Sequence, residues 1–273
     1  MDNRPIGFFD SGIGGLTSVK NVMRDLPDER IIFFGDTART PYGSKAQGTI
    51  IEFSLQIAEF LVNQGVKMIV IACNTVSAVA LDVLRSKYPD IRIIGVIAPT
   101  SREAVKLHRP DERMGIIATK ATTKTGAYGR KIKKLASDIH IFSKACPAFV
   151  PLIEEGIIDN QIMDLTIKYY LDDFVCENKL DTLILGCTHY PIIEKNIRKI
   201  YPDVRIINSS KEVATAVRME LDEYDMFADH KTHDDRGNVF YASDLSENVV
   251  EMIEMILGQE KEELNINFKN LDI

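Results

Sequence analysis

The sequence has 273 residues, of which 45% are hydrophobic and 27% are charged, and its formal net charge at pH 7 is -7. This composition is typical of a globular protein with a large core, and the acidic balance argues against a nucleic-acid-binding face, which needs clustered basic residues. No apolar run is long enough to span a bilayer, and the first residues lack the layout of a signal peptide. We therefore expect a cytoplasmic protein of one large or two ordinary domains, with no nucleic-acid and no membrane partner.

Short apolar runs alternate along the chain with segments of helical periodicity, a pattern that predicts a parallel sheet covered by helices. Strands are expected at residues 6–10, 30–35, 68–74, 92–98, 113–119, 138–146, 181–187 and 204–209. Helices are expected, for example, at residues 16–27, 48–65, 76–89, 191–202 and 246–260. Several of these helical segments close with Gly or Pro, where a helix is expected to stop. The predicted fold class is therefore α/β.

Two of the expected strands end in matching frames around a cysteine. "MIVIACNTVSAV" contains Cys73, and "TLILGCTHYPII" contains Cys187. Each continues through a helical segment into a similar strand, "SKYPDIRIIGV" after the first and "RKIYPDVRIIN" after the second. This repeat indicates two related α/β halves, although chance similarity between two strand–helix–strand units would give the same pattern.

Both cysteines lie where a strand ends and a helix begins, which in open α/β sheets is the edge that binds ligands. The helix N-terminus supplies free N–H groups and partial positive charge, which favour a reactive thiolate. One buried cysteine is more often an ordinary core residue, but two in matching frames favour a nucleophile or a base. Cys146 and Cys176 lack this context, and we interpret them as structural. Because the chain has no C-x-x-C spacing, free thiols in a reducing compartment are expected.

Polar side chains follow the two cysteines and other predicted strand ends. His189 is a candidate proton-handling partner of Cys187, because the unperturbed pKa of histidine is near neutrality. The other candidates at strand ends are Asp10, Ser11, Asp36, Tyr42, Gly43, Asn74, Thr75, Ser77, Thr119, Thr122 and Thr188. The turn after Ser11 resembles a dinucleotide-binding fingerprint, but Thr17 occupies the position of its third glycine, so a tight turn is an equal interpretation. Glu154 stands beside Glu155, where a solvated surface is the simpler interpretation.

Several common kinds of site are absent from the sequence. Cys187 and His189 form a single pair with no second pair at zinc spacing, so no metal site is expected. There is no P-loop, and no G-x-S-x-G segment that would indicate a serine hydrolase. The short basic run at residues 130–134 has no interleaved aromatic residues, and we interpret it as a solvated helix face.

Four fragments, "GFFDSGIGGLT", "FFGDTARTPYG", "IACNT" and "LILGCTHYP", occur together in this order, and in them the chain resembles bacterial glutamate racemases over nearly its whole length. The resemblance implies a cofactor-independent isomerase that supplies D-glutamate for peptidoglycan, and so for cell wall biogenesis and cell shape. It also implies two similar parallel-sheet α/β domains that face each other across a cleft and are related by a pseudo-two-fold axis. Residues 1–97 plus 209–273 would form the first domain, with Cys73, and residues 98–208 an inserted second domain, with Cys187.

The same resemblance implies roles for the candidate residues. Cys73 and Cys187 are the two acid/base residues. Asp10, Glu154 and His189 assist the thiols, with Asp36 as a lesser candidate. The implied substrate pocket is lined by Asp10, Ser11, Tyr42, Gly43, Asn74, Thr75, Thr188 and His189, with Thr119 and Thr122 as further candidates. No cofactor and no metal is implied, the partner is the small-molecule substrate glutamate, and a homodimer is the candidate assembly.

Racemisation explains why such a protein would need two cysteines in matching frames. The reaction removes the α-proton from one face of the carbon and returns a proton to the other, which two bases on opposite sides can do and one cannot easily do. The α-hydrogen is a very weak acid beside a thiol of pKa ~8.5. The site must therefore stabilise the carbanion with hydrogen bonds and exclude water.

Two alternatives are compatible with the sequence. One is a sister racemase that acts on aspartate or a related substrate, although the "GCTHYP" frame with His189 favours glutamate. The other is a non-catalytic binding protein with two α/β lobes, in which nothing would require paired cysteines. Turnover of glutamate, of aspartate or of neither separates the three hypotheses.

Overall fold

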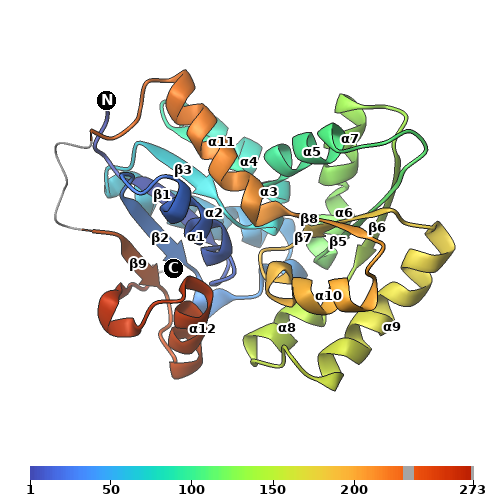
Figure 1. Ribbon diagram of the computed structural model, residues 1–273. Coiled ribbons are helices and arrows are strands. Elements are labelled where there is room, and N and C mark those ends of the chain that lie inside the picture. Colours follow the sequence, from blue (N-terminus) through green and yellow to red (C-terminus); the bar gives the residue numbers. More distant parts are fainter. Residues whose placement is uncertain (230–236, 272–273) are drawn as a thin grey trace.

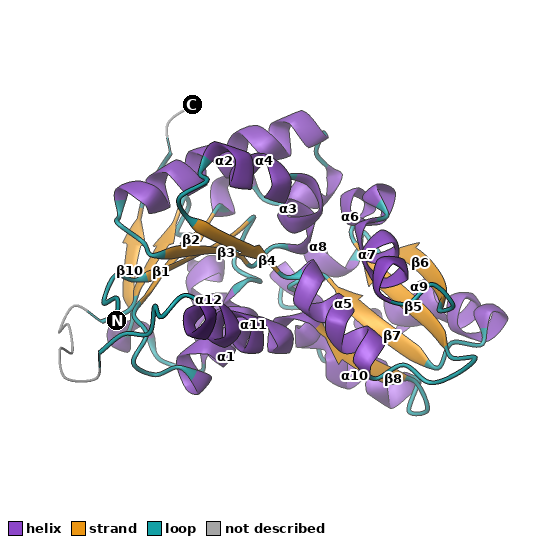
Figure 2. Cartoon of the chain, turned by 90° about the horizontal axis from the view of Figure 1, so that it is seen from above, coloured by secondary structure: helices purple, strands orange, loops and turns teal. Residues whose placement is uncertain are grey.

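The computed structural model describes residues 1–229 and 237–271 of the chain (Figure 1). In this part of the chain ten strands form two separate sheets, and all neighbouring strands are parallel. Figure 2 shows the sheets in two halves of the molecule, each covered by helices. The predicted α/β fold with two parallel-sheet domains is therefore confirmed.

The larger sheet has the strand order β10-β9-β2-β1-β3-β4. Its strands are β1 (Ile6–Asp10), β2 (Ile31–Gly35), β3 (Met68–Ile71), β4 (Arg92–Gly95), β9 (Val239–Ala242) and β10 (Asn265–Phe268). Every residue of β1, β2 and β3 is buried. This burial explains why these strands are continuous apolar runs, since helices cover a parallel sheet on both faces.

The smaller sheet has the order β6-β5-β7-β8. Its strands are β5 (Arg113–Ala118), β6 (His140–Ala145), β7 (Thr182–Gly186) and β8 (Arg205–Asn208). This order repeats β2-β1-β3-β4 strand for strand, so β3 and β7, which precede the two cysteines, hold equivalent positions. The internal repeat predicted from the cysteine frames is thus a repeat of the whole sheet topology.

The helices divide between the two sheets in the same way. Those that follow strands of the larger sheet are α1 (Leu16–Asp25), α2 (Gln47–Asn63), α3 (Asn74–Val79), α4 (Leu81–Lys87) and α12 (Glu247–Leu257). Those between strands of the smaller sheet are α6 (Lys120–Thr125), α7 (Ala127–Leu135), α8 (Phe149–Glu154), α9 (Gln161–Asn178) and α10 (Glu194–Ile200). Short 3-10 turns are η1 (Thr37–Arg39), η2 (Tyr42–Ser44), η3 (Tyr190–Ile193) and η4 (Lys261–Glu263). Two helices, α5 (Ile97–Lys106) and α11 (Ser209–Glu223), connect the sheets and pack against each other (Figure 2).

Local sequence explains where several helices begin and end. The side chain of Asn160 accepts a hydrogen bond from the backbone N–H of Met163 at 3.1 Å and caps α9. Ser246 caps α12 in the same way through Val249. Such caps satisfy backbone donors that the first turn of a helix leaves unpaired. Gly258 ends α12 with a φ of 72°, in the left-handed region that glycine adopts most easily.

All eight strands expected from the sequence are present, but those expected at residues 68–74 and 92–98 are too long, because α3 begins at Asn74 and α5 begins at Ile97. The strands β9 and β10 were not predicted. Each is only four residues long, and β10 is exposed at both ends. Pairing with the distant strand β2 places β9 in the larger sheet, and no local pattern records that pairing.

All four cysteines are free, as expected. Cys146 is buried, in agreement with a structural role, but Cys176 is exposed on α9, so its interpretation as a structural core residue is wrong. The basic run at residues 130–134 lies on α7, where Arg130, Lys133 and Lys134 are exposed. Among the described residues, no helix combines the length and the apolar character needed to cross a membrane.

Candidate active site

The predicted functional residues lie just beyond the carboxyl ends of strands in both sheets. Cys73 comes two residues after the end of β3, and Cys187 directly follows β7. Both are buried, with 4% and 5% of their surface exposed. The loop after β1 touches the loop after β7, since a Cβ added to Gly14 would lie 2.6 Å from Nδ1 of His189. Glycine at position 14 therefore allows the loops of the two halves to approach.

Asp10 and Ser11, at the end of β1, flank Cys73. The Ser11 hydroxyl oxygen lies 3.3 Å from the Cys73 sulfur. One carboxylate oxygen of Asp10 accepts a hydrogen bond from the backbone N–H of Gly15 at 2.8 Å, while the other is buried without a hydrogen-bond partner in the described residues. Burial raises the pKa of the Cys73 thiol, the negative charge of Asp10 raises it further, and the hydrogen bond with Ser11 lowers it. Cys73 is therefore held as a thiol close to a carboxylate.

His189 lies between Cys187 and Glu154. Its Nδ1 is 4.0 Å from the Cys187 sulfur, and its Nε2 is 3.0 Å from a carboxylate oxygen of Glu154. Burial by itself lowers the pKa of His189, but the hydrogen bonds and charges of Cys187 and Glu154 outweigh it and raise that pKa well above its ordinary value. An imidazolium at this position is placed to stabilise negative charge on the Cys187 sulfur.

The structure corrects the interpretation of Glu154 as a solvated surface residue. Glu154 is half-buried against His189, and only its neighbour Glu155 is exposed. The side chain of Thr188 also lies against the imidazole, with its hydroxyl 3.5 Å from Nδ1. Glu154 is the last residue of α8 and His189 follows Cys187 after β7, so both belong to the half with the smaller sheet, 35 positions apart in the chain.

A cluster of threonine hydroxyls joins the two halves. The Thr75 hydroxyl on α3 lies 3.0 Å from that of Thr119 and 3.2 Å from that of Thr122. Thr119 and Thr122, at the start of α6, are 3.0 Å apart. Gly43 lies against this cluster, because a Cβ added to it would be 2.7 Å from the Cβ of Thr119. Four of the predicted binding residues are therefore brought together from separate parts of the chain.

Asp36 is buried, and its carboxylate is fully engaged. It accepts hydrogen bonds from the Tyr42 hydroxyl, from Nε of Arg39 at 2.7 Å and from the Ser243 hydroxyl at 2.8 Å. Burial raises the pKa of Tyr42, and the Asp36 charge adds to that rise. Because both carboxylate oxygens are occupied, Asp36 is suited to orient Tyr42 rather than to exchange a proton with a substrate.

Asn74 and Ser77 follow Cys73 on α3 but have different surroundings. The carboxamide oxygen of Asn74 accepts a hydrogen bond from the Tyr128 hydroxyl at 2.6 Å. The Ser77 hydroxyl is bound within the larger sheet, where it donates to the backbone oxygen of Ile71 and accepts from the N–H of Val96. Ser77 is therefore structural. Tyr128 carries no signal in the sequence, because its partner Asn74 belongs to the other half of the molecule.

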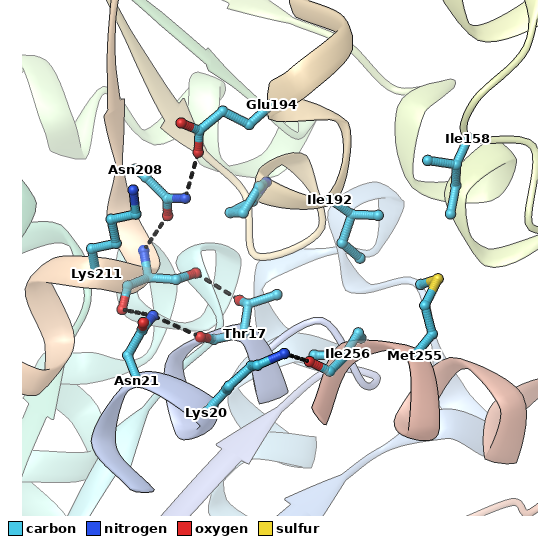
Figure 3. Close-up of a pocket in the computed structure, with 12 residues that line it drawn as sticks. Thr17, Lys20, Asn21, Ile158, Ile192, Glu194, Asn208, Lys211, Met255 and Ile256 are labelled. Atoms are coloured by element: carbon cyan, nitrogen blue, oxygen red, sulfur yellow. Dashed lines mark hydrogen bonds between the residues drawn. The ribbon is translucent and has the colours of Figure 1, made fainter. Parts of the chain in front are cut away.

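A cavity of about 490 Å³ lies beside the loop that carries His189, between helices of both halves (Figure 3). Its polar groups are partly engaged, since Lys20 donates to the backbone oxygen of Ile256 at 2.9 Å and Asn208 donates to Glu194 at 2.7 Å. None of the residues predicted to bind substrate lines this cavity. It is therefore distinct from the site built around the cysteines.

Glu154→Gln is expected to lower the pKa of His189, because it removes a negative charge 3.0 Å from Nε2. A raised folded-state pKa means that protonated His189 adds stability in full below the unfolded pKa of roughly 6.5, and that this stability is lost as pH rises through the folded pKa. The variant should therefore lose this stability at a lower pH than the wild type. NMR titration of the imidazole measures the shift, and Glu155→Gln, at the exposed neighbouring position, is the matched control. Equal pKa values in the wild type and in Glu154→Gln would show that the ion pair is not formed.

Comparison with known proteins decides the family. The sequence profile of the Asp/Glu/Hydantoin racemase family matches residues 16–217. The glutamate racemase of Persephonella marina is 48% identical over 221 residues, which cover 81% of this chain and 83% of that protein. The glutamate racemase of Aquifex aeolicus is 40% identical over 258 residues, which cover 94% of this chain and 95% of that protein. The chain belongs to the glutamate racemase family.

The fold agrees with this membership over the whole chain. The crystal structure of the glutamate racemase from Francisella tularensis in complex with D-glutamate matches with a TM-score of 0.91 at 41% identity. The match covers 100% of this chain and 99% of that one. The family resemblance stated from the four sequence fragments is thereby confirmed, and the protein is an amino-acid racemase. The alternative of a non-catalytic binding protein is not supported.

Proposed function

We propose that this protein interconverts L-glutamate and D-glutamate with two bases, Cys73 and Cys187, which act on opposite faces of the α-carbon. The observation that carries the proposal is the pair of buried thiols at equivalent strand ends of a repeated sheet. At any moment one sulfur is a thiolate that removes the α-proton, and the other is a thiol that returns one. The two roles are exchanged when the direction of the reaction is reversed.

The two thiols have different neighbours, and the family resemblance implies that Cys187 serves L-glutamate and Cys73 serves D-glutamate. Burial and the charge of Asp10 raise the pKa of Cys73 and keep it protonated, whereas the imidazolium of His189 lies 4.0 Å from the Cys187 sulfur, where it can stabilise negative charge. In this state Cys187 takes the α-proton of L-glutamate, and Cys73 delivers a proton to the other face. The reverse direction starts from the opposite protonation state, with Cys73 as the base for D-glutamate.

The remaining site residues bind the substrate and stabilise the carbanion. The buried, unpartnered carboxylate oxygen of Asp10 is suited to the substrate ammonium group. The hydroxyls of Ser11, Thr75 and Thr188 and the amide of Asn74 are donors for the substrate carboxylates. Hydrogen bonds to the α-carboxylate stabilise the negative charge that develops when the proton leaves, most strongly where water is excluded.

Racemisation without a cofactor is tested on purified protein that has been dialysed against a chelator. We expect the optical rotation of L-glutamate to fall to zero, with no visible-range chromophore and no gain on adding pyridoxal phosphate or a divalent metal. In the described residues, no group of three or more His, Cys, Asp and Glu could hold a metal ion, and cofactor independence stays a prediction. Turnover of aspartate but not of glutamate would favour the sister racemase, and rescue by a cofactor would refute the two-thiol chemistry.

We also propose the domain boundaries, the cellular role and the assembly of the protein. We place residues 1–97 plus 209–273 in one domain and residues 98–208 in the other, a division that the distribution of strands between the two sheets supports. The D-glutamate produced would enter peptidoglycan synthesis in the cytoplasm. The candidate assembly is a homodimer, which light scattering of the purified protein tests directly.

A further inference from the structure

Tyr128 lies between the two strand ends that carry the cysteines. It belongs to α7 and is 3% exposed. A Cβ added to Gly186, the residue before Cys187, would lie 3.2 Å from Cε2 of the Tyr128 ring. At the other end of the ring, the hydroxyl donates a hydrogen bond of 2.6 Å to Asn74, the residue after Cys73. One side chain therefore contacts the immediate neighbour of each catalytic cysteine.

The hydroxyl of Tyr128 lies where the two halves of the molecule are joined. The side chains of Thr100, on α5, and Ser209, the first residue of α11, lie beside it. Ser209 donates to the backbone oxygen of Leu185 in β7 at 2.9 Å and lies 3.5 Å from the Asn74 amide nitrogen. Since α5 and α11 are the two connections between the sheets (Figure 2), this polar cluster links both connections to both cysteine-bearing edges.

We propose that Tyr128 is a positioning residue that fixes the separation of Cys73 and Cys187 across the substrate, a role that rests on the two-thiol function proposed above. Two-base racemisation requires both sulfurs to reach the same α-carbon in one bound geometry. A misplacement of about 1 Å can cost on the order of 10²-fold in rate. The ring of Tyr128 supports the edge with Cys187, and its hydroxyl holds the edge with Cys73.

Tyr128 acts through its neighbours rather than on the substrate. Burial raises the pKa of its hydroxyl, the side chains of Thr100 and Ser209 lower it by less, and the group stays protonated as a donor. That donor is occupied by the carboxamide oxygen of Asn74. Glycine at position 186 is part of the same arrangement, because a side chain there would also meet the backbone oxygen of Ile117 at 2.9 Å.

Tyr128→Phe tests the proposal, because it removes the hydroxyl and leaves the ring against Gly186. We expect kcat to fall by roughly 10- to 100-fold in both directions, with KM changed by less than about threefold. The matched control is Tyr201→Phe, which removes a hydroxyl bonded to Asp172 at 2.5 Å, away from the cysteines. The control should keep the wild-type kcat, and circular dichroism confirms that both variants are folded.

A double-mutant cycle separates positioning from a merely structural role. If Tyr128 acts through Asn74, Tyr128→Phe should cause little further loss of kcat in an Asn74→Ala background. Ser209→Ala, which removes the other partner of the Asn74 amide, should lower kcat in the same way and serves if Tyr128→Phe does not fold. The inference about Tyr128, but not the proposed function, would be overturned if Tyr128→Phe or Ser209→Ala kept the wild-type kcat. It would also be overturned if the losses in kcat of Tyr128→Phe and Asn74→Ala multiplied in the double variant. A wild-type protein that does not racemise glutamate would overturn the proposed function as well.

Discussion

Cys73→Ala and Cys187→Ala are each expected to abolish racemisation of glutamate in both directions. Either direction needs one sulfur as the base and the other as the acid, so the loss of one sulfur stops both. The double variant should be no worse than either single variant, because the two thiols act as a unit. Cys176→Ala is the matched control, since Cys176 is an exposed thiol on α9 and should be dispensable.

A substrate analogue with a leaving group on the β-carbon identifies which thiol serves which face. Removal of the α-proton then leads to elimination, and no second proton transfer is needed. Cys187→Ala should still eliminate from the D-analogue but not from the L-analogue, and Cys73→Ala should show the reverse preference. Elimination is followed as release of the leaving group. If both variants treat the two enantiomers alike, the assignment of one thiol to each face of the α-carbon is wrong. The cysteines would then share a face or be structural.

His189→Asn is expected to lower kcat/KM by roughly 10²- to 10⁴-fold, the range for loss of a positioned acid–base group. The His189 imidazole lies within hydrogen-bond reach of the Cys187 sulfur, and Cys187 and Glu154 together raise the pKa of His189. Because the two enantiomers of glutamate have equal free energy, kcat/KM must fall by the same factor in both directions.

Elimination again resolves the side on which His189 acts. With His189→Asn, elimination from the L-analogue should slow much more than elimination from the D-analogue, because Cys187 removes the proton of the L-form. His140→Asn is the control, since His140 is an exposed histidine on β6 in the same sheet. An equal slowing for both enantiomers would place His189 in substrate binding rather than beside Cys187 as its proton partner.

The sequence by itself determined the fold class, eight of the strands and the two cysteine frames. These features are local, because a parallel strand buried on both faces must be a continuous apolar run, and a ligand-binding edge must come directly after it. Cys73 and Cys187 could therefore be singled out from a few residues around each. The repeat of the sheet topology was indicated by the same local signals, because the frame around Cys73 recurs around Cys187.

Only the tertiary structure decided which groups serve each thiol. In the sequence, Glu154 beside Glu155 has the pattern of a surface position. In the fold, His189, which is 35 positions further along the chain, lies against it. Tyr128 carries no motif, yet it touches Gly186 in one half and Asn74, 54 positions away, in the other. Strand β9 was missed for the same reason, since its pairing with the distant strand β2 defines it, and β10 joins the sheet only through β9. Hydrogen bonds and packing between segments far apart in the chain depend on how the two sheets are brought together, and no periodicity within a segment encodes them.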